Sequence, residues 1–139
     1  MRNPVLSVLF LIVCFGLAAC RNISSDKTGP SIGDIKTSGN VLVISDCSGT
    51  SVTISTKVTD PSSVGKVLLW FRTGTDQQFV STAMELKEGI YSVDLKGPDF
   101  LGRPYGTLEF YITAEDGLGN LSRSTVDQSV QFLPCVNSS

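Results

Sequence analysis

In the segment Leu108-Glu109-Phe110-Tyr111-Ile112-Thr113-Ala114, every second residue is apolar, beginning with Leu108, and the residues between them carry polar groups. A period of two is typical of a β-strand that buries one of its faces. Asp116-Gly117-Leu118-Gly119-Asn120 follows directly, and its residues are those that tolerate the positive φ angles of a hairpin connection. This part of the chain therefore predicts a strand that turns back on itself, with Leu108, Phe110 and Ile112 facing a core.

The chain on either side repeats this β-type pattern, and no segment after the N-terminus predicts a helix convincingly. Breaks such as Asp60-Pro61 and Gly97-Pro98 separate the strands. Further strands are expected at residues 41–44, 51–58, 66–72, 78–84, 90–95 and 122–133. About seven short strands with polar turns between them predict an all-β, antiparallel β-sandwich.

Four segments resemble the immunoglobulin-like and fibronectin type III-like modules of bacterial surface proteins. They are Val58–Pro61, Val67–Phe71, Gly89–Val93 and Phe110–Asn120, and the likeness covers about residues 30–135. The resemblance implies an Ig-like β-sandwich. It implies no particular ligand, because such modules serve as spacers, adhesins and binding domains alike.

The N-terminus carries a targeting pattern. Arg2 precedes an apolar run from Val5 to Leu17 that is too short to span a bilayer comfortably, and Leu17-Ala18-Ala19-Cys20 follows. These four residues resemble the lipobox of bacterial lipoproteins, which implies cleavage before Cys20, a diacylglycerol on its thiol and an acyl chain such as palmitate on its amine. An ordinary secretory signal with Ala-x-Ala-like cleavage, or an uncleaved anchor, is the alternative.

We therefore expect three parts: a lipoprotein signal peptide at residues 1–19, a lipidated cysteine with a flexible tether at 20–30, and an Ig-like domain at 31–139. The predicted location is extracytoplasmic, on a bacterial membrane, at the cell surface or the periplasmic face. The chain has no polybasic patch, so the lipid on Cys20 is expected to be the whole anchor, and two or more acyl chains hold stably.

The four cysteines divide accordingly. Cys14 lies in the apolar run of the signal and Cys20 is taken by lipid, which leaves Cys47 and Cys135 in an oxidising compartment. We predict that these two form a disulfide, because no CxxC motif and no histidine favours a metal or redox role.

The charged residues are interspersed, with 11 basic and 13 acidic side chains and a formal net charge of −2. No basic run suits a phosphate backbone, so nucleic acid is not expected as a partner. The chain has no histidine, the usual general base, and the carboxylate pairs Glu85/Glu88 and Glu115/Asp116 are typical of solvated turns and strand ends. The sequence therefore predicts a protein that is not an enzyme and needs no cofactor.

A calcium site is the alternative to consider, since Asp60 and the Glu115–Asn120 turn should meet at one pole of the predicted sandwich. Asp60, Asp116 and Asn120 offer oxygen atoms there, but Ca²⁺ requires six to eight. Such residues commonly shape a turn through side-chain-to-backbone bonds instead. No metal site is predicted, and these three residues remain the weak candidate.

The aromatic residues give the stronger indication of function. If Val67, Leu69 and Phe71 face the core, then Leu68 and Trp70 face outward. Tyr111 faces outward on a strand that is expected to be a neighbour, so Leu68, Trp70 and Tyr111 form a candidate ligand-binding patch. The alternatives are that Trp70 belongs to the core, or that the 78–84 segment or a loop covers the patch.

The predicted function is that of a non-catalytic, lipid-anchored surface protein that binds an envelope or extracellular component, either a polysaccharide or a protein. The alternative is a structural or accessory scaffold subunit of a larger envelope assembly.

Overall fold

The computed structural model describes residues 26–43 and 50–135, and this part of the chain is all-β. It contains a single turn of 3-10 helix, η1 (Gly97–Phe100), and no α-helix. No helix in the described ranges has the length and apolar character needed to cross a bilayer.

The largest sheet has β10 and β6 at its centre. Its strand order is β3-β12-β10-β6-β7, and β11 also pairs with β10. The strands of this sheet are β3 (Val41–Val43), β6 (Val64–Thr73), β7 (Val80–Ala83), β10 (Gly106–Asp116), β11 (Leu121–Arg123) and β12 (Asp127–Leu133).

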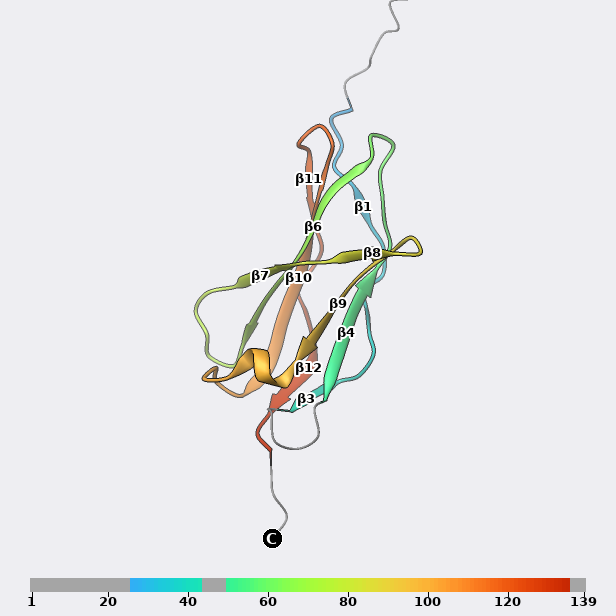
Figure 1. Cartoon of the computed structure of the whole chain (residues 1–139). Helices are drawn as coiled ribbons and strands as arrows, with labels where there is room; N and C mark the ends of the chain where they lie inside the picture. The colour runs from blue at the N-terminus through green and yellow to red at the C-terminus, as the bar shows by residue number, and fades with distance from the viewer. Residues whose placement is uncertain (1–25, 44–49, 136–139) are drawn as a thin grey trace, which may run out of the picture.

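A second sheet, in the order β2-β4-β9-β8, lies across the first. Its strands are β2 (Lys36–Thr37), β4 (Ser51–Thr56), β8 (Glu85–Lys87) and β9 (Ile90–Lys96), and a small pair is formed by β1 (Ser31–Ile32) and β5 (Val58–Thr59). Figure 1 shows β4 and β9 side by side in front of the β6, β10 and β12 layer. The architecture is therefore sandwich-like.

The core lies between these layers, because alternate residues of the central strands point inward. In β6 the buried side chains include Val67, Leu69 and Phe71, and β4 and β9 contribute Ile54 and Leu95 from the other sheet. In β10 they are Leu108, Phe110, Ile112 and Ala114, as the alternation in the sequence predicts. Phe100 of η1 is fully buried and packs against Phe71 and Phe132 at centroid distances of 5.2 Å.

One short segment forms an edge of both sheets. β7 pairs with β6, and β8 pairs with β9 in the other sheet. Only Met84 separates β7 from β8, and its side chain is buried. Figure 1 shows β7 and β8 as an almost continuous line across the molecule.

The prediction of about seven strands was wrong, because the described residues form twelve. Half of these are only two or three residues long, too short to show a period in the sequence; they are β1, β2, β3, β5, β8 and β11. The segment expected as one strand at 122–133 is divided between β11 and β12. Between them Ser124 exchanges two 2.9 Å hydrogen bonds with the backbone of Ile112, accepting one through its hydroxyl and donating one from its own N–H.

The prediction of a purely antiparallel sheet also needs correction. β3 pairs with β12 in parallel, with Val41, Leu42 and Val43 opposite Gln131, Phe132 and Leu133. Leu42 and Phe132 are both fully buried, so the register is set by core packing. All other strand pairs in the described ranges are antiparallel.

Several predictions fall on residues that the structure does not describe. These are the signal peptide, Cys20 and Cys47, and they stay predictions. Cys135 follows β12 at the end of the described chain. The expected tether is described only from Asp26 onward, and there Pro30 is fully buried against the domain.

Candidate ligand-binding face

The outer surface of the β6–β10 pair carries the residues that the sequence singled out. Trp70 is the Cα partner of Tyr111, and Leu68 is the Cα partner of Thr113. Residues directly opposite each other on antiparallel strands project from the same face of the sheet. Since Leu69 and Phe71 are buried in the core, Leu68 and Trp70 lie on the opposite face, where both are partly exposed.

The rings of Trp70 and Tyr111 are nearly parallel. Their centroids are 6.1 Å apart and their planes differ by 6°. Phe79, from the segment before β7, meets Tyr111 edge-on at 5.0 Å. Trp70 donates its indole N–H to the hydroxyl of Thr113 at 3.0 Å, which fixes the orientation of the indole on the sheet. We call this surface the aromatic face. It consists of Leu68, Trp70, Phe79, Tyr111 and Thr113, together with the polar residues that border them, Arg72, Glu109, Gln128 and Arg123.

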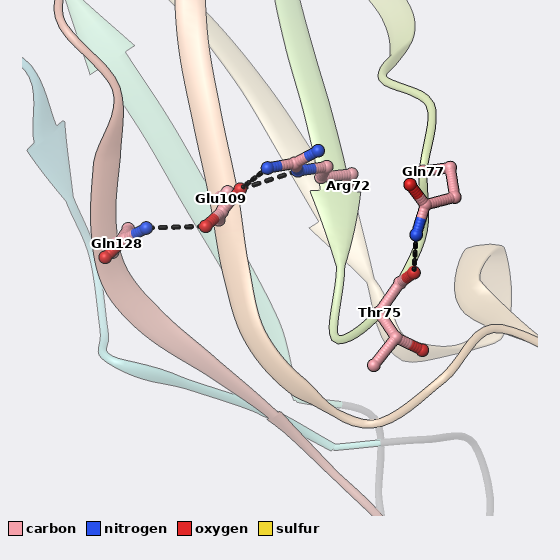
Figure 2. A network of polar contacts seen from close by, with 5 residues as sticks. All are labelled: Arg72, Thr75, Gln77, Glu109 and Gln128. Carbon is pink, nitrogen blue, oxygen red and sulfur yellow. Dashed lines mark hydrogen bonds and ion pairs between the residues drawn. The ribbon is translucent and has the colours of Figure 1, made fainter.

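A polar row borders the aromatic residues along the same strands. Glu109 of β10 lies between Arg72 of β6 and Gln128 of β12, as Figure 2 shows. Arg72 donates from Nε to Glu109 Oε2 at 2.6 Å, and the Gln128 amide donates to Oε1 at 2.5 Å. Both oxygens of Glu109 are therefore engaged, and the guanidinium of Arg72 also lies 4.6 Å from the centroid of Phe79.

A second arginine lies at the other end of the aromatic face. Arg123 of β11 is the Cα partner of Thr113, and its guanidinium carbon lies 3.7 Å from the centroid of the Tyr111 ring. The residue is exposed. Because β11 and β6 flank β10, Tyr111 has Arg123 on one side and Trp70 on the other.

The structure therefore brings the three predicted patch residues together on one face. The 78–84 segment does contribute a cover, since Phe79 packs against the edge of Tyr111, yet Trp70 and Tyr111 remain partly exposed. The sequence analysis missed Phe79, Arg72, Glu109 and Arg123. Arg72 and Glu109 could have been found, because each lies two residues from a predicted outward aromatic residue on its own strand.

A cluster of carboxylates lies at one end of the molecule. Asp26, Asp60 and Asp116 each place an oxygen within 4.8 Å of the others. Asn120 donates its amide N–H to Asp116 at 2.7 Å and to the backbone carbonyl of Asp26 at 3.0 Å. The sequence placed Asp60 and Asp116 at this pole but missed Asp26, which comes from the expected tether.

Hydrogen bonds already occupy these carboxylates. Asp116 accepts from the backbone N–H groups of Leu118 and Asn120, both at 2.8 Å, so it shapes the β10–β11 turn. Burial, the largest single cause, opposes the ionisation of Asp116, but the hydrogen bonds from Asn120 and Leu118 together outweigh it and lower the pKa of this carboxyl below its usual value. The hydroxyl and backbone of Thr28, followed by the Ser62 hydroxyl, lower the pKa of Asp26. The cluster therefore fastens the start of the domain to two turns.

Comparison with known proteins gives little further guidance. No family model matches the chain, and no curated protein matches it. Among solved structures, the chain is similar to part of a β-glucosidase from Erythrobacter marinus, at 19% identity and a TM-score of 0.39. The similarity covers 76% of this chain and only 16% of that chain.

This similarity requires one correction. The sequence predicted a chain that is not an enzyme, and the similarity to a β-glucosidase contradicts that prediction, which we withdraw. At this TM-score the similarity carries no argument for an activity, so none is assigned to the chain.

Proposed function

We propose that this chain is a bacterial surface lipoprotein, anchored through Cys20, whose Ig-like domain binds an envelope or extracellular component through the aromatic face. The aromatic face is the observation that carries the proposal. It combines partly exposed, parallel aromatic rings with charged and amide side chains on a rigid sheet. Aromatic rings stack on sugar rings and pack against protein side chains, while the polar groups beside them fix the orientation of a ligand.

Two features support the Ig-like part of the proposal. The β4–β9 layer and the β6–β10–β12 layer enclose one core, and β11 returns antiparallel along β10 after the Asp116–Asn120 turn. These are the segments on which the resemblance to Ig-like modules rests.

The position of the domain's first residues supports the predicted anchor. Asp26 is held by Ser62 and Asn120, and Figure 1 shows this beginning of the described chain at the end opposite the C-terminus. Only a short segment separates Asp26 from Cys20, so a lipid on Cys20 would keep this end of the domain next to the membrane.

The anchor is tested by expressing the chain in a bacterium with labelled palmitate. We expect the label in the protein and the protein in the membrane fraction, and Cys20→Ser to lose both. Cys14→Ser is the matched control, since this residue belongs to the apolar part of the signal. Label that survives Cys20→Ser would contradict the proposal.

Binding is tested with the intrinsic fluorescence of Trp70, the only tryptophan of the chain. We expect its emission to change when envelope extracts are titrated into the full chain in detergent, and Trp70→Ala to abolish binding measured by calorimetry. Leu86→Ala is the control, because Leu86 is 57% exposed on β8, in the other sheet. Equal binding by the wild type and Trp70→Ala would refute the proposed site, and co-purification with one protein at fixed stoichiometry would favour the scaffold alternative.

A further inference from the structure

We infer that the ligand of the aromatic face is an anionic polysaccharide, with a sugar ring against Trp70 and a carboxylate or sulfate of the sugar on Arg123. The inference deepens the proposed function and rests on it, since it names the class of ligand for the same face.

The negative charge beside the aromatic rings is already compensated. Both oxygens of Glu109 are engaged, one by the Arg72 guanidinium and one by the Gln128 amide (Figure 2). Glu115 and Lys66 are Cα partners on the same face, and their opposite charges cancel in the net charge of the face although no ion pair joins them in the described ranges. Arg123 forms no ion pair with any residue in the described ranges, and it is exposed. The charge left over on this face is therefore positive and lies next to Tyr111.

The contact between Arg123 and Tyr111 prepares the guanidinium for an anion. A guanidinium that lies over a ring keeps the N–H donors along its edge free, and two of them match the oxygens of a carboxylate or sulfate. The ring also restricts the long arginine side chain before a ligand arrives, which reduces the entropy lost on binding. Arg72 is less available, because its Nε and Nη2 atoms are both engaged by Glu109.

Trp70 and Tyr111 offer complementary contacts to a sugar. The indole N–H of Trp70 is already donated to Thr113, so the indole presents mainly its apolar ring surface. Toward β7, the Cα partner of Trp70 is Ser81, and Ala83 lies two residues further along the same strand. Both side chains are small, so they leave space beside the indole for a sugar ring. The hydroxyl of Tyr111 has no hydrogen-bond partner within the described ranges, so it can donate to a sugar oxygen.

The experiment compares charged and neutral glycans on the full chain in a detergent without a sugar headgroup. The probes are oligogalacturonide for carboxylate, dextran sulfate for sulfate and unsubstituted dextran as the neutral control. We expect at least one anionic probe to shift Trp70 emission and to bind about tenfold more tightly than dextran, with an affinity that falls as salt is added. Which anionic probe binds distinguishes the carboxylate source from the sulfate source.

Two variants separate a specific site from general charge attraction. Arg123→Gln should reduce affinity for the anionic probe about tenfold and leave the weak affinity for dextran unchanged. Lys87→Gln removes the same charge from β8, on the other sheet, and should change neither affinity. Equal losses from the two variants would overturn the inference, because the attraction would then be unspecific.

The outcomes also distinguish the inference from the proposed function. If anionic and neutral glycans bind equally, or if no glycan binds while an envelope extract still shifts Trp70 emission, the inference falls and the proposed function stands. If neither glycans nor extracts bind in a manner that depends on Trp70, both fall.

Discussion

Neighbouring residues on β10 give a direct test of which face is the core. Phe110 is fully buried and Tyr111 is partly exposed on the other side of the same strand. Phe110→Ala removes a ring that is enclosed on all sides, and such substitutions cost about 3–5 kcal/mol of the free energy of unfolding. A partly exposed ring costs less to remove.

The expected cost of Tyr111→Ala follows from its contacts. The substitution removes the parallel contact with Trp70, the edge contact with Phe79 and the guanidinium contact with Arg123. Each of the two aromatic pairs contributes about 0.5–1.5 kcal/mol and the exposed cation–π contact about 0.5–1 kcal/mol. Because the ring is partly exposed, the lower part of the summed range applies, and we expect a loss of about 2 kcal/mol. The two variants should therefore differ clearly in stability.

Urea unfolding of the full chain in detergent, followed by far-UV circular dichroism, measures both losses. Circular dichroism is needed because Tyr111→Ala changes the surroundings of Trp70 and thus its emission. In thermal unfolding, each kcal/mol of unfolding free energy that a variant loses should lower the melting temperature by about 4–8 °C for a domain of this size. A loss for Tyr111→Ala that equals or exceeds the loss for Phe110→Ala would refute the assignment of the core and the outer face.

Three further predictions concern other parts of the molecule. The lowered pKa values of Asp26 and Asp116 mean that ionisation of these carboxyls stabilises the fold above the usual aspartate pKa of 3.8, and that this stabilisation is lost as the pH falls through the lower folded pKa values. An acid titration of the unfolding free energy should show this loss, and the pH-dependent loss should be smaller in Asp116→Asn. Gly74→Ala should cost about 2 kcal/mol in urea unfolding, because φ is +52° and a Cβ would lie 2.5 Å from the Tyr105 carbonyl oxygen; Gly89→Ala, with φ of +81° and open space, should cost only about 1 kcal/mol, and equal losses would contradict the steric argument. If Cys47 and Cys135 form the predicted disulfide, Cys47→Ser should raise the number of titratable thiols in the unreduced, denatured protein by one and cost about 4–5 kcal/mol of unfolding free energy, whereas a thiol count that falls by one would rule the disulfide out.

The long strands of the core were predictable because their apolar residues alternate or form a run between turn residues. β4, β9 and β10 lie where the period of two placed them, and β6 lies where the apolar run at 67–71 placed it; Leu68, Trp70 and Tyr111 share a face because alternate residues of a strand do. A local period contains no information about which distant strands pair. The parallel pairing of β3 with β12 depends on packing between Leu42 and Phe132, and no local pattern indicates it.

The same limit explains the missed parts of the sites. Asp26 lies in a polar segment that is typical of a tether, and only the folded chain brings its carbonyl to Asn120, 94 positions away. Phe79 lies in an irregular segment before β7, where no strand period indicates its direction. Arg123 was obscured because a single strand was expected where the chain forms β11 and β12.

The pairing of β3 with β12 has a consequence for the order of folding. Within the described ranges, residues 41–43 pair with residues 131–133, which lie far away in the sequence, so this edge of the sheet cannot close until β12 is available. Contacts between such distant residues are slow to form, and β-domains dominated by them fold in milliseconds to seconds. If the chain is exported N-terminus first, as the proposed function implies, this edge of the sheet stays open until β12 has crossed the membrane, and a narrow export channel requires such an incompletely folded state.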